Sequence, residues 1–402
     1  MVYNLLFYGH YTSFCTEQNN NVDAKDEYLR TIISHTQPDI FAVNEMGPGQ
    51  ANADRLLNHV MNADGRTGYE RASYTNTANS NLVNMLFFNG EKFALYGESV
   101  VANIVRDINL YTLFYRDEDL ENGSDTVFLH ILVTHMKAGS SAADQQRRMQ
   151  EAVAVMGYIE QMNIRGNVLF MGDFNMNSSF EQAYQLITYH PNEDIRFFDP
   201  TDKPGVWWNN PDMAPYHTQS TRTGSHPCFV TGGMDDRYDL ILATASIMQG
   251  LLGLHLVEGT YRAVGQDGQR FNQSLITPEN LSEPHEVIMA LYHMSDHLPV
   301  KMKMTVSEPL NTSFSAPDVS ADLRVVLNRQ TQTLQLHLSE SYTGLSAEII
   351  SVHGNTLLSK NKTGWFGPGT LNMNISGVPP GVYVLRLTAK HSDAVVKKLM
   401  IY

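Results

Sequence analysis

Residues able to hold a metal ion or transfer a proton stand beside short apolar stretches at five places in the chain. They are Glu45, His135, Asp173 with Asn175, Asp239, and Asp296 with His297. Each apolar stretch has the length of a buried strand, and ligand sites in α/β proteins gather at the ends of strands. The pattern therefore predicts that these side chains meet at one edge of a packed sheet.

Each of these residues, taken alone, has an ordinary structural explanation. Glu45 would be a solvated turn residue, and His135 a hydrogen-bonded structural histidine. Asp239 would pair with the nearby Arg237. The segment Gly-Asp-Phe-Asn at 172–175 is typical of a turn in which Asp and Asn bond the local backbone. It is the joint occurrence of the five places that favours a function.

The chemistry that the set permits is phosphoester hydrolysis. Oxygen ligands are offered by Glu45, Asp173, Asn175 and Asp296. They suit a hard divalent cation, Mg²⁺ first and otherwise Ca²⁺ or Mn²⁺, whereas no His/Cys cluster has the spacing of a zinc site. Histidine side chains such as His135 and His297 can titrate near neutral pH. A cation would neutralise phosphate oxygens while one group deprotonates water and another supports the leaving oxygen.

Composition limits the classes of protein to which the chain can belong. Its 402 residues suggest two or three domains at roughly 150 residues each. The net charge of −14 argues against binding nucleic acid through a broad basic face. No apolar stretch approaches the roughly 18 residues that a membrane span needs. Cys15 and Cys228 either form one disulfide or remain buried thiols, and their spacing does not decide between these.

The elements that must position the polar residues alternate between strands and helices up to about residue 306. Apolar residues recur at helical spacing over about 22–35 and 141–162. Short apolar stretches predict strands at 5–8, 39–43, 85–88, 127–133, 168–171, 240–243 and 299–304. The Ser- and Pro-rich segment 307–320 predicts a linker, and the alternating stretches in 321–402 predict a small β-sandwich.

Five segments carry a family resemblance. They are Asn44-Glu45, Thr134-His135, GDFN at 172–175, Arg237-Tyr238-Asp239 and SDHLPV at 295–300. In this order they resemble the endonuclease/exonuclease/phosphatase superfamily, which includes pancreatic deoxyribonuclease, abasic-site endonucleases, bacterial sphingomyelinases and inositol polyphosphate phosphatases. The resemblance covers about residues 1–306. It implies a four-layered α/β sandwich of two packed mixed β-sheets flanked by helices, with the site at one edge.

The same resemblance implies roles for the oxygen ligands. Glu45 would be the principal metal ligand, and Asp296 the neighbouring carboxylate that binds metal or water. Asp173 and Asn175 would orient the attacking water and the phosphate.

The resemblance also implies roles for the histidines and one arginine. Asp239 would pair with His297. His135 matches the second histidine of the deoxyribonuclease-like branch and would assist the leaving group. Arg106 stands where family members often place an arginine that contacts phosphate, and the alternative is a surface ion pair with Asp107.

Two departures from the family pattern concern partners of these residues. The family normally ends its first strand with Asn, whereas Gly9 follows the apolar stretch here. Asn4 precedes most of that stretch, so we expect that it does not substitute and that the site lacks a side-chain amide. We would then expect Gly9→Asn to strengthen metal binding. His135 has no evident carboxylate partner, and Asn84 or a residue near it is expected to take that place.

The tail, residues 321–402, resembles a C-terminal sorting domain of the type IX secretion system. The segments that carry the resemblance are GVYVLRL at 381–387 and KKL at 397–399. The resemblance implies engagement of the secretion machinery and release or anchoring at the cell surface, and no stable protein partner is inferred. Because Met1 leads directly into a strand, we expect that an export signal has been removed. The alternative is a small carbohydrate-binding or immunoglobulin-like module.

The leading hypothesis is a secreted, divalent-metal-dependent phosphoesterase, most like a nuclease, in which an activated water attacks phosphorus in line. One alternative is a phosphatase acting on phospholipid head groups or sugar phosphates, and another is a catalytically weakened binding protein. The acidic balance and the lack of Lys/Arg runs favour small phosphoesters over tight binding of DNA. Segment 217–222 lies where the family's substrate loops often fall. Nearby aromatic residues could stack on a base or sugar, but we favour loop packing for them: Trp207, Trp208, Tyr216 and His217.

Overall fold

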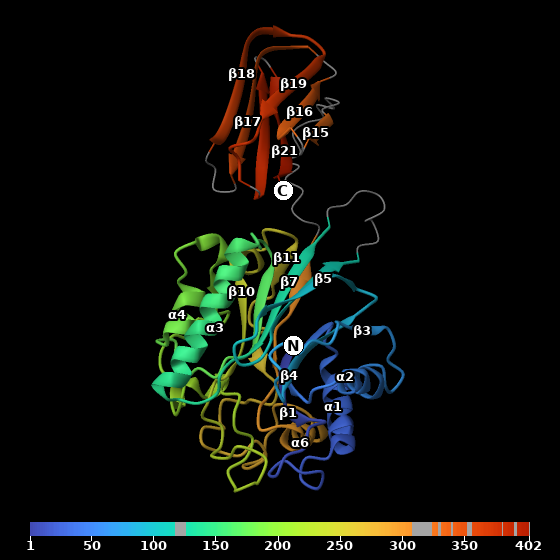
Figure 1. Ribbon diagram of the computed structural model, residues 1–402, viewed down its shortest axis with the longest axis vertical. Coiled ribbons are helices and arrows are strands. Elements are labelled where there is room, and N and C mark those ends of the chain that lie inside the picture. Colours follow the sequence, from blue (N-terminus) through green and yellow to red (C-terminus); the bar gives the residue numbers. More distant parts are fainter. Residues whose placement is uncertain are drawn as a thin grey trace. The chain divides into compact units, whose positions relative to one another are not determined.

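The computed structural model describes residues 1–116, 126–307, 324–328, 331–338, 341–351, 356–379, 381–389 and 392–401. The chain forms two compact units, Met1–Pro309 and Leu310–Tyr402 (Figure 1). The predicted linker, 307–320, lies outside the described residues apart from Ser307. Within the described residues, no helix is long and apolar enough to cross a membrane.

The first of two six-stranded mixed sheets has the strand order β12-β13-β1-β2-β4-β3. Its strands are β1 (Val2–Tyr8), β2 (Ile40–Met46), β3 (Tyr69–Arg71), β4 (Val83–Asn89), β12 (Arg262–Ala263) and β13 (Val300–Lys301). Strands β1 and β2 run parallel, and the other neighbours run antiparallel. The parallel pair at the centre carries the polar residues of this sheet toward one edge.

The second sheet has the strand order β5-β6-β7-β8-β10-β9. Its strands are β5 (Phe93–Ala102), β6 (Ile108–Tyr115), β7 (Phe128–His135), β8 (Val168–Asp173), β9 (Phe197–Phe198) and β10 (Asp239–Thr244). Here β7 and β8 are the parallel pair, and β10 lies antiparallel beside β8. The carboxyl ends of β7 and β8 therefore lie beside the amino end of β10.

One predicted strand is divided in the structure. The stretch 299–304 contributes β13 to the first sheet, but β14 (Met304–Val306) pairs instead with β11 (Leu254–Leu256) in a separate two-stranded sheet. The chain leaves the first sheet after Lys301, and this explains why one apolar stretch gives two short strands.

The helices begin where the sequence offers caps. Asn21 accepts a hydrogen bond from the backbone N–H of Ala24, and Ser141 forms a capping box with Asp144. The helices are α1 (Val22–Thr36), α2 (Gln50–Leu56), α3 (Ala142–Gln161), α4 (Gln182–Thr188), α5 (Ala245–Gln249) and α6 (His285–Met294). The bounds of α1 and α3 agree with the two predicted helices to within one residue.

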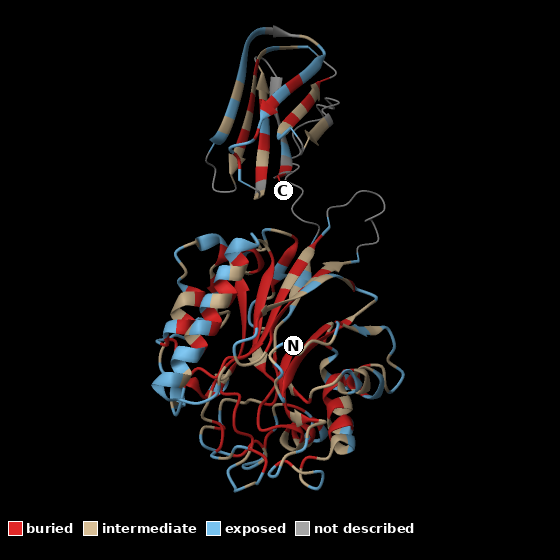
Figure 2. Cartoon of the chain, in the orientation of Figure 1, coloured by how far each residue is buried: buried red, intermediate tan, exposed pale blue. Residues whose placement is uncertain are grey.

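Four layers result from this packing. Helices α1 and α6 cover the first sheet, and α3 and α4 cover the second (Figure 1). Buried apolar residues of both sheets face each other in the main core, as Phe41, Phe87, Leu129 and Met171 do. Figure 2 shows the burial along both sheets and the exposed outer faces of the helices. The predicted four-layered α/β sandwich is confirmed.

The second unit is all-β, as predicted. Its antiparallel sheets have the orders β15-β16-β19 and β18-β17-β20-β21. The strands are β15 (Arg324–Asn328), β16 (Thr333–Leu338), β17 (Tyr342–Ser351), β18 (Thr356–Phe366), β19 (Gly369–Asn374), β20 (Gly381–Ala389) and β21 (Ser392–Ile401). Residues of both sheets, such as Leu336, Ile349 and Leu385, form its core.

We expect the first unit to fold and act without the second, because each unit has a hydrophobic core of its own residues. A chain that ends at Ser307 keeps β14 and its partner β11. It should remain soluble, with an unfolding midpoint within a few degrees of the full chain and the same turnover. Calorimetry and an activity assay check this. Unfolding, or loss of turnover in a folded truncated chain, would contradict the division at 307–320.

Candidate active site

The register of three neighbouring strands gathers the polar residues of the second sheet. His135, the last residue of β7, is paired with Asp173, the last residue of β8. Asp173 is in turn paired with Asp239, the first residue of β10. The three side chains therefore stand side by side at one edge of the sheet, and the exposed fraction of each residue is 2% or less.

Asn4 links the first sheet to this row. Its Nδ2 donates to Glu45 Oε1 and to Asp173 Oδ2, with both distances 3.0 Å. Glu45 lies at the end of β2, where its backbone turns into the left-handed region at φ 57°. One fully buried amide thus joins carboxylates that belong to different sheets.

The expectation that the site lacks a side-chain amide is wrong. Gly9 has φ +69°, and a Cβ there would lie 2.4 Å from Asn52 Oδ1. Asn4 supplies the amide instead, so the proposed gain from Gly9→Asn has no structural basis. The alternative of a catalytically weakened protein rested on the missing amide and therefore loses its support.

An irregularity in β1 explains why Asn4 reaches the site. Asn4 pairs with Asn44 of β2, but the register then shifts before the pairing of Tyr8 with Met46. Leu6 and Phe7 have φ values of 45° and 54°, which take the backbone out of the ladder. Asn4 is therefore the last regularly paired residue of β1, although apolar residues follow it in the sequence.

We expect Asn4→Ala to weaken binding of a divalent cation by about 10- to 100-fold, because it releases two carboxylates that the amide holds together. Calorimetric titration with Mn²⁺ measures the change. Asn167→Ala is the matched control. Asn167 lies just before β8, at the end of the strand away from Asp173, and its buried amide donates to the carbonyls of Phe128 and Leu252. Equal affinities in the two variants would show that Asn4 has no part in the site.

His297 and Asp239 form a hydrogen-bonded pair. His297 Nδ1 lies 2.7 Å from Asp239 Oδ2, and its Nε2 lies 3.9 Å from Asp173 Oδ2. Burial alone would lower the pKa of His297, but the charge and hydrogen bond of Asp239, with Asp173 and Asp296 nearby, raise this pKa well above its usual value. His297 is therefore held as an imidazolium between carboxylates.

His135 has the opposite electrostatic character. Burial, with Arg106 and His297 nearby, lowers the pKa of His135 well below its usual value. Its Nε2 lies 3.5 Å from Asp173 Oδ2 and 3.8 Å from Glu45 Oε1. Its buried Nδ1 has no hydrogen-bond partner among the described residues. The ring is thus a neutral imidazole that directs Nε2 into the site.

Asn84 does not partner His135, contrary to expectation. Its Nδ2 donates to the carbonyls of Asp107 and Val133, and its Oδ1 accepts from Asn44. Asn84 belongs to the polar contacts between the two sheets, because Asn44 Nδ2 also donates to a carbonyl of the second sheet.

The donor set fits a hard divalent cation. Ligand atoms of Glu45, His135 and Asp173 lie within 4.8 Å of one another, as do those of Asp173, Asp239 and His297. Burial raises the pKa of Glu45, and Asp296 acts in the same direction. Burial also raises the pKa of Asp173 to about 7, although His297 opposes the rise. A cation beside these carboxylates would stabilise their charged forms.

Asp296 and Asn175 lie beside these two groups of ligands. Asp296 Oδ2 accepts from the backbone N–H of Val230 at 2.9 Å and lies outside both groups. Asn175, with φ 52°, donates its backbone N–H to Asp173 Oδ1 at 3.0 Å. Its Nδ2 donates to the Met136 carbonyl at 3.2 Å. Asn175 thus orients Asp173 through its backbone.

Arg106 approaches the site from the loop between β5 and β6. Its Nη1 lies 3.3 Å from the His135 carbonyl, and its buried Nε has no hydrogen-bond partner among the described residues. The Asp107 carboxylate accepts the backbone N–H groups of Thr77 and Ala78, both at 2.7 Å. The alternative of an ion pair between Arg106 and Asp107 is therefore not what the structure forms.

Two further residues at the site were not singled out from the sequence. Gln219 Nε2 lies 3.3 Å from Asp296 Oδ2 and 2.7 Å from His297 Nε2. Lys25 of α1 is buried, and its Nζ donates to the Leu5 carbonyl at 2.7 Å. The only sequence feature that could have indicated Gln219 is its place in segment 217–222, where the family's substrate loops often fall. No sequence feature distinguishes Lys25 from any other lysine on an amphipathic helix.

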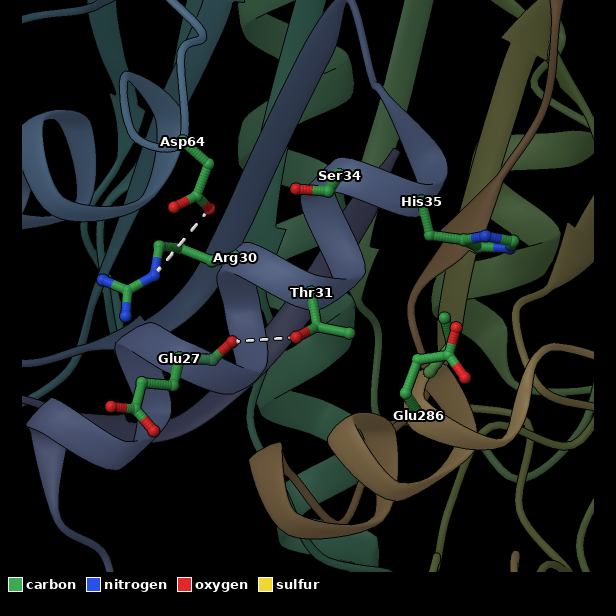
Figure 3. A pocket seen from close by; sticks show the side chains of 8 residues that line it. Glu27, Arg30, Thr31, Ser34, His35, Asp64 and Glu286 are labelled. Atoms are coloured by element: carbon green, nitrogen blue, oxygen red, sulfur yellow. Dashed lines mark hydrogen bonds and ion pairs between the residues drawn. The ribbon is translucent and has the colours of Figure 1, made fainter.

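A groove of about 550 Å³ lies on α1 and α6 (Figure 3). Two of its lining residues have partners: Arg30 Nε lies 3.9 Å from Asp64, and His35 Nε2 lies 2.7 Å from Glu283. It is lined by Glu27, Arg30, Thr31, Ser34, His35, Asp64, Glu286 and Val287. Because none of these residues belongs to the cluster at the strand ends, we place the candidate site at the strand ends and not in this groove.

Comparison with known protein families shows the family of the first unit. A sequence model of the endonuclease/exonuclease/phosphatase family matches residues 1–297. The chain belongs to this family. Family members are generally hydrolases that act on phosphoesters, and their fold generally uses a divalent metal ion. The candidate site supplies carboxylate and histidine ligands for such an ion.

The second unit matches a different family model from the first. A secretion system C-terminal sorting domain matches residues 328–402. This indicates export through the type IX system, so the protein is extracellular or held at the cell surface. No curated protein matches the chain.

Several solved structures of the family resemble the chain at low identity. An endonuclease/exonuclease/phosphatase from Bacteroides vulgatus is 14% identical, with a TM-score of 0.47, over 76% of this chain and 97% of that one. A mannosyl-6-phosphatase from Bacteroides thetaiotaomicron is 13% identical, with a TM-score of 0.47, over 76% and 98%. D. rerio TDP2, complexed with single-strand DNA product, is 11% identical, with a TM-score of 0.46, over 76% and 97%.

Proposed function

We propose that the protein is a secreted, divalent-metal-dependent phosphoesterase that hydrolyses P–O bonds by in-line attack of an activated water. The observation that carries the proposal is the Asn4 amide between Glu45 and Asp173, which stands beside the His297–Asp239 pair. This arrangement combines oxygen ligands for a cation with groups that move protons or hold charge.

Glu45 would hold the cation through its own carboxylate, and Asp296 would be the neighbouring carboxylate that binds the cation or its water. When bound, the cation neutralises the charge that develops on phosphate oxygens. Asn4 keeps Glu45 and Asp173 at a fixed separation. Arg106, whose Nε has no hydrogen-bond partner among the described residues, contacts the phosphate.

Four side chains transfer protons or hold charge in the reaction: His135, Asp173, Asp239 and His297. Asp173, which Asn175 helps to orient, accepts the proton of the attacking water. The water oxygen bonds to phosphorus as the ester P–O bond breaks. The His297 imidazolium, held by Asp239, donates a hydrogen bond to a phosphate oxygen. His135 Nε2–H supports the leaving oxygen, which takes its proton from solvent.

A nuclease-like activity on phosphodiesters is the first candidate. The second histidine, His135, supports it, because it stands within 4 Å of both carboxylates and can assist a poor leaving group. A small phosphoester, such as a phospholipid head group or a sugar phosphate, is the second candidate. The net charge of −14 favours it, since a polyanion would meet a repulsive field.

A substrate panel tests the proposal. The panel contains DNA, RNA, sphingomyelin and small phosphomonoesters, each assayed with Mg²⁺, Ca²⁺ or Mn²⁺ and with a chelator. We expect hydrolysis of at least one class, which the chelator abolishes. Cleavage of DNA or RNA selects the nuclease-like candidate, and release of phosphate or a phosphorylated head group selects the second. No hydrolysis across the panel by a protein that binds the cation would overturn the proposal in favour of a binding protein.

A further inference from the structure

Cys15 and Cys228, which stand 213 residues apart in the sequence, are joined by a disulfide. We propose that this bond is a positioning element of the metal site, because it contacts two segments that each present a backbone N–H to a carboxylate of the site. The inference rests on the proposed metal site. It assigns to the disulfide a role in cation affinity in addition to any role in stability.

The first segment is the turn at Leu6 and Phe7, which precedes Cys15 in the chain and packs against it; we call it the β1 turn. Phe7 donates its backbone N–H to Glu45 Oε2 at 3.3 Å. Leu6 donates its backbone N–H to Asn4 Oδ1 at 3.0 Å, and this contact directs the Asn4 amide hydrogens toward Glu45 and Asp173. The β1 turn therefore sets the position of Glu45 both directly and through Asn4.

The β1 turn is costly to form, because φ values of 45° and 54° place two bulky residues in the left-handed region. It persists because its surroundings hold it. From inside, Lys25 Nζ donates to the carbonyls of Leu5 and Leu6. Asn20 Nδ2 donates to the carbonyls of Leu6 and Phe7, at 3.3 and 3.1 Å.

The disulfide packs against the same turn. Leu6, Cys15, Cys228 and Phe229 form one buried apolar cluster, and Phe7 packs against it. Both cysteines are buried, with exposed fractions of 0% and 7%. The bond thus provides apolar packing for a turn that the backbone would not adopt freely.

The second segment is the loop that carries Cys228. Two residues after this cysteine, Val230 donates its backbone N–H to Asp296 Oδ2 at 2.9 Å. The loop is anchored on its far side by Arg222, which lies between the rings of Phe229 and Tyr292 at 4.4 and 3.9 Å from their centroids. The disulfide therefore packs against the turn that supports Glu45 and lies in the loop that supports Asp296.

Calorimetric titration with Mn²⁺ tests the proposal on the full chain and on the double variant Cys15→Ala/Cys228→Ala. We expect the dissociation constant to rise by about 10-fold, as is typical when supports of metal ligands are removed. Half-maximal turnover should need correspondingly more cation, while kcat at saturating cation stays near the wild-type value. Ile159→Ala is the stability control, because it opens the separate core under α3.

Lys25→Met is the second variant, because it removes the inner support of the β1 turn without depending on the cysteines. It should weaken Mn²⁺ binding in the same direction, which tests the β1 turn as a support of the site. If the double variant does not fold, Mn²⁺ titration of the wild-type chain before and after reduction of the disulfide keeps the test decisive, and we expect weaker binding after reduction. The proposal would be overturned if the folded variants bound Mn²⁺ with wild-type affinity and only their unfolding midpoint fell, as we expect for Ile159→Ala. The disulfide would then be a purely structural bond. Absence of Mn²⁺ binding by the wild-type chain would overturn the metal site itself.

Discussion

Glu45→Gln should abolish binding of the divalent cation and, with it, turnover. The substitution keeps the size of the side chain and an oxygen that can accept from Asn4, but it removes the charge that the proposed cation binds. Loss of a principal ligand should weaken affinity by more than about 100-fold, since loss of an outer support alone costs up to that amount. Calorimetric titration with Mg²⁺ and Mn²⁺ measures it.

Glu283→Gln is the matched control for this substitution. Glu283 is also buried and paired, with His35 and Arg262, but it lies outside the site. Its variant should bind the cation as the wild type does even if it is less stable. Equal affinity of the wild type and the Glu45→Gln variant would remove Glu45 from the metal site.

His297→Ala should lower kcat by about 10²- to 10⁴-fold while the chain stays folded. The loss removes an imidazolium that Asp239 holds 2.7 Å away and that faces Asp173. Asp239→Asn should cause a smaller loss of the same kind, because His297 then keeps its place but loses the charge that favours the imidazolium. Single-turnover rates at saturating substrate separate this effect on the reaction from an effect on binding.

His130→Ala provides the comparison within the same protein. His130 is on β7, as His135 is, but its Nδ1 bonds Thr112 Oγ1 at 2.9 Å, away from the cluster. Its variant should keep the wild-type kcat. Turnover within a few-fold of wild type in folded His297→Ala would show that this histidine takes no part in the reaction.

Much of the fold was predictable because strand and helix periodicities are local. The apolar stretches of β2, β4, β7, β8 and β10 each have a polar or turn residue at an end, and α1 and α3 carry their own caps. The division of 299–304 between β13 and β14 was not predictable, because it depends on a distant partner, β11.

The candidate site was predictable as a set of residues but not as a geometry. Strand-end position and the family motifs pointed to Glu45, Asp173 and His297, whose contacts the structure then defines. The position of Asn4 was not predictable, because in a regular first strand this residue would lie well before the strand's carboxyl end. Only the shift of register after Asn4, with left-handed backbone at Leu6 and Phe7, brings that amide to the strand's functional end.

The remaining contacts depend on long-range folding. Gln219 meets His297 across 78 residues, and Lys25 reaches the β1 turn from a helix face that looks like any other in the sequence. The pairing of Cys15 with Cys228 spans 213 residues. No local pattern encodes such distances, so these features follow from the assembled sheets.

We propose that water attacks phosphorus at this site with the help of a divalent cation. The decisive experiment is hydrolysis of the best substrate of the panel in H₂¹⁸O, with Mg²⁺ and in a parallel reaction with a chelator, followed by mass spectrometry of both products. We expect ¹⁸O to enter the phosphate product in the presence of Mg²⁺, and we expect no product from the chelated protein. Label in the alcohol product, or hydrolysis undiminished by the chelator, would exclude this mechanism.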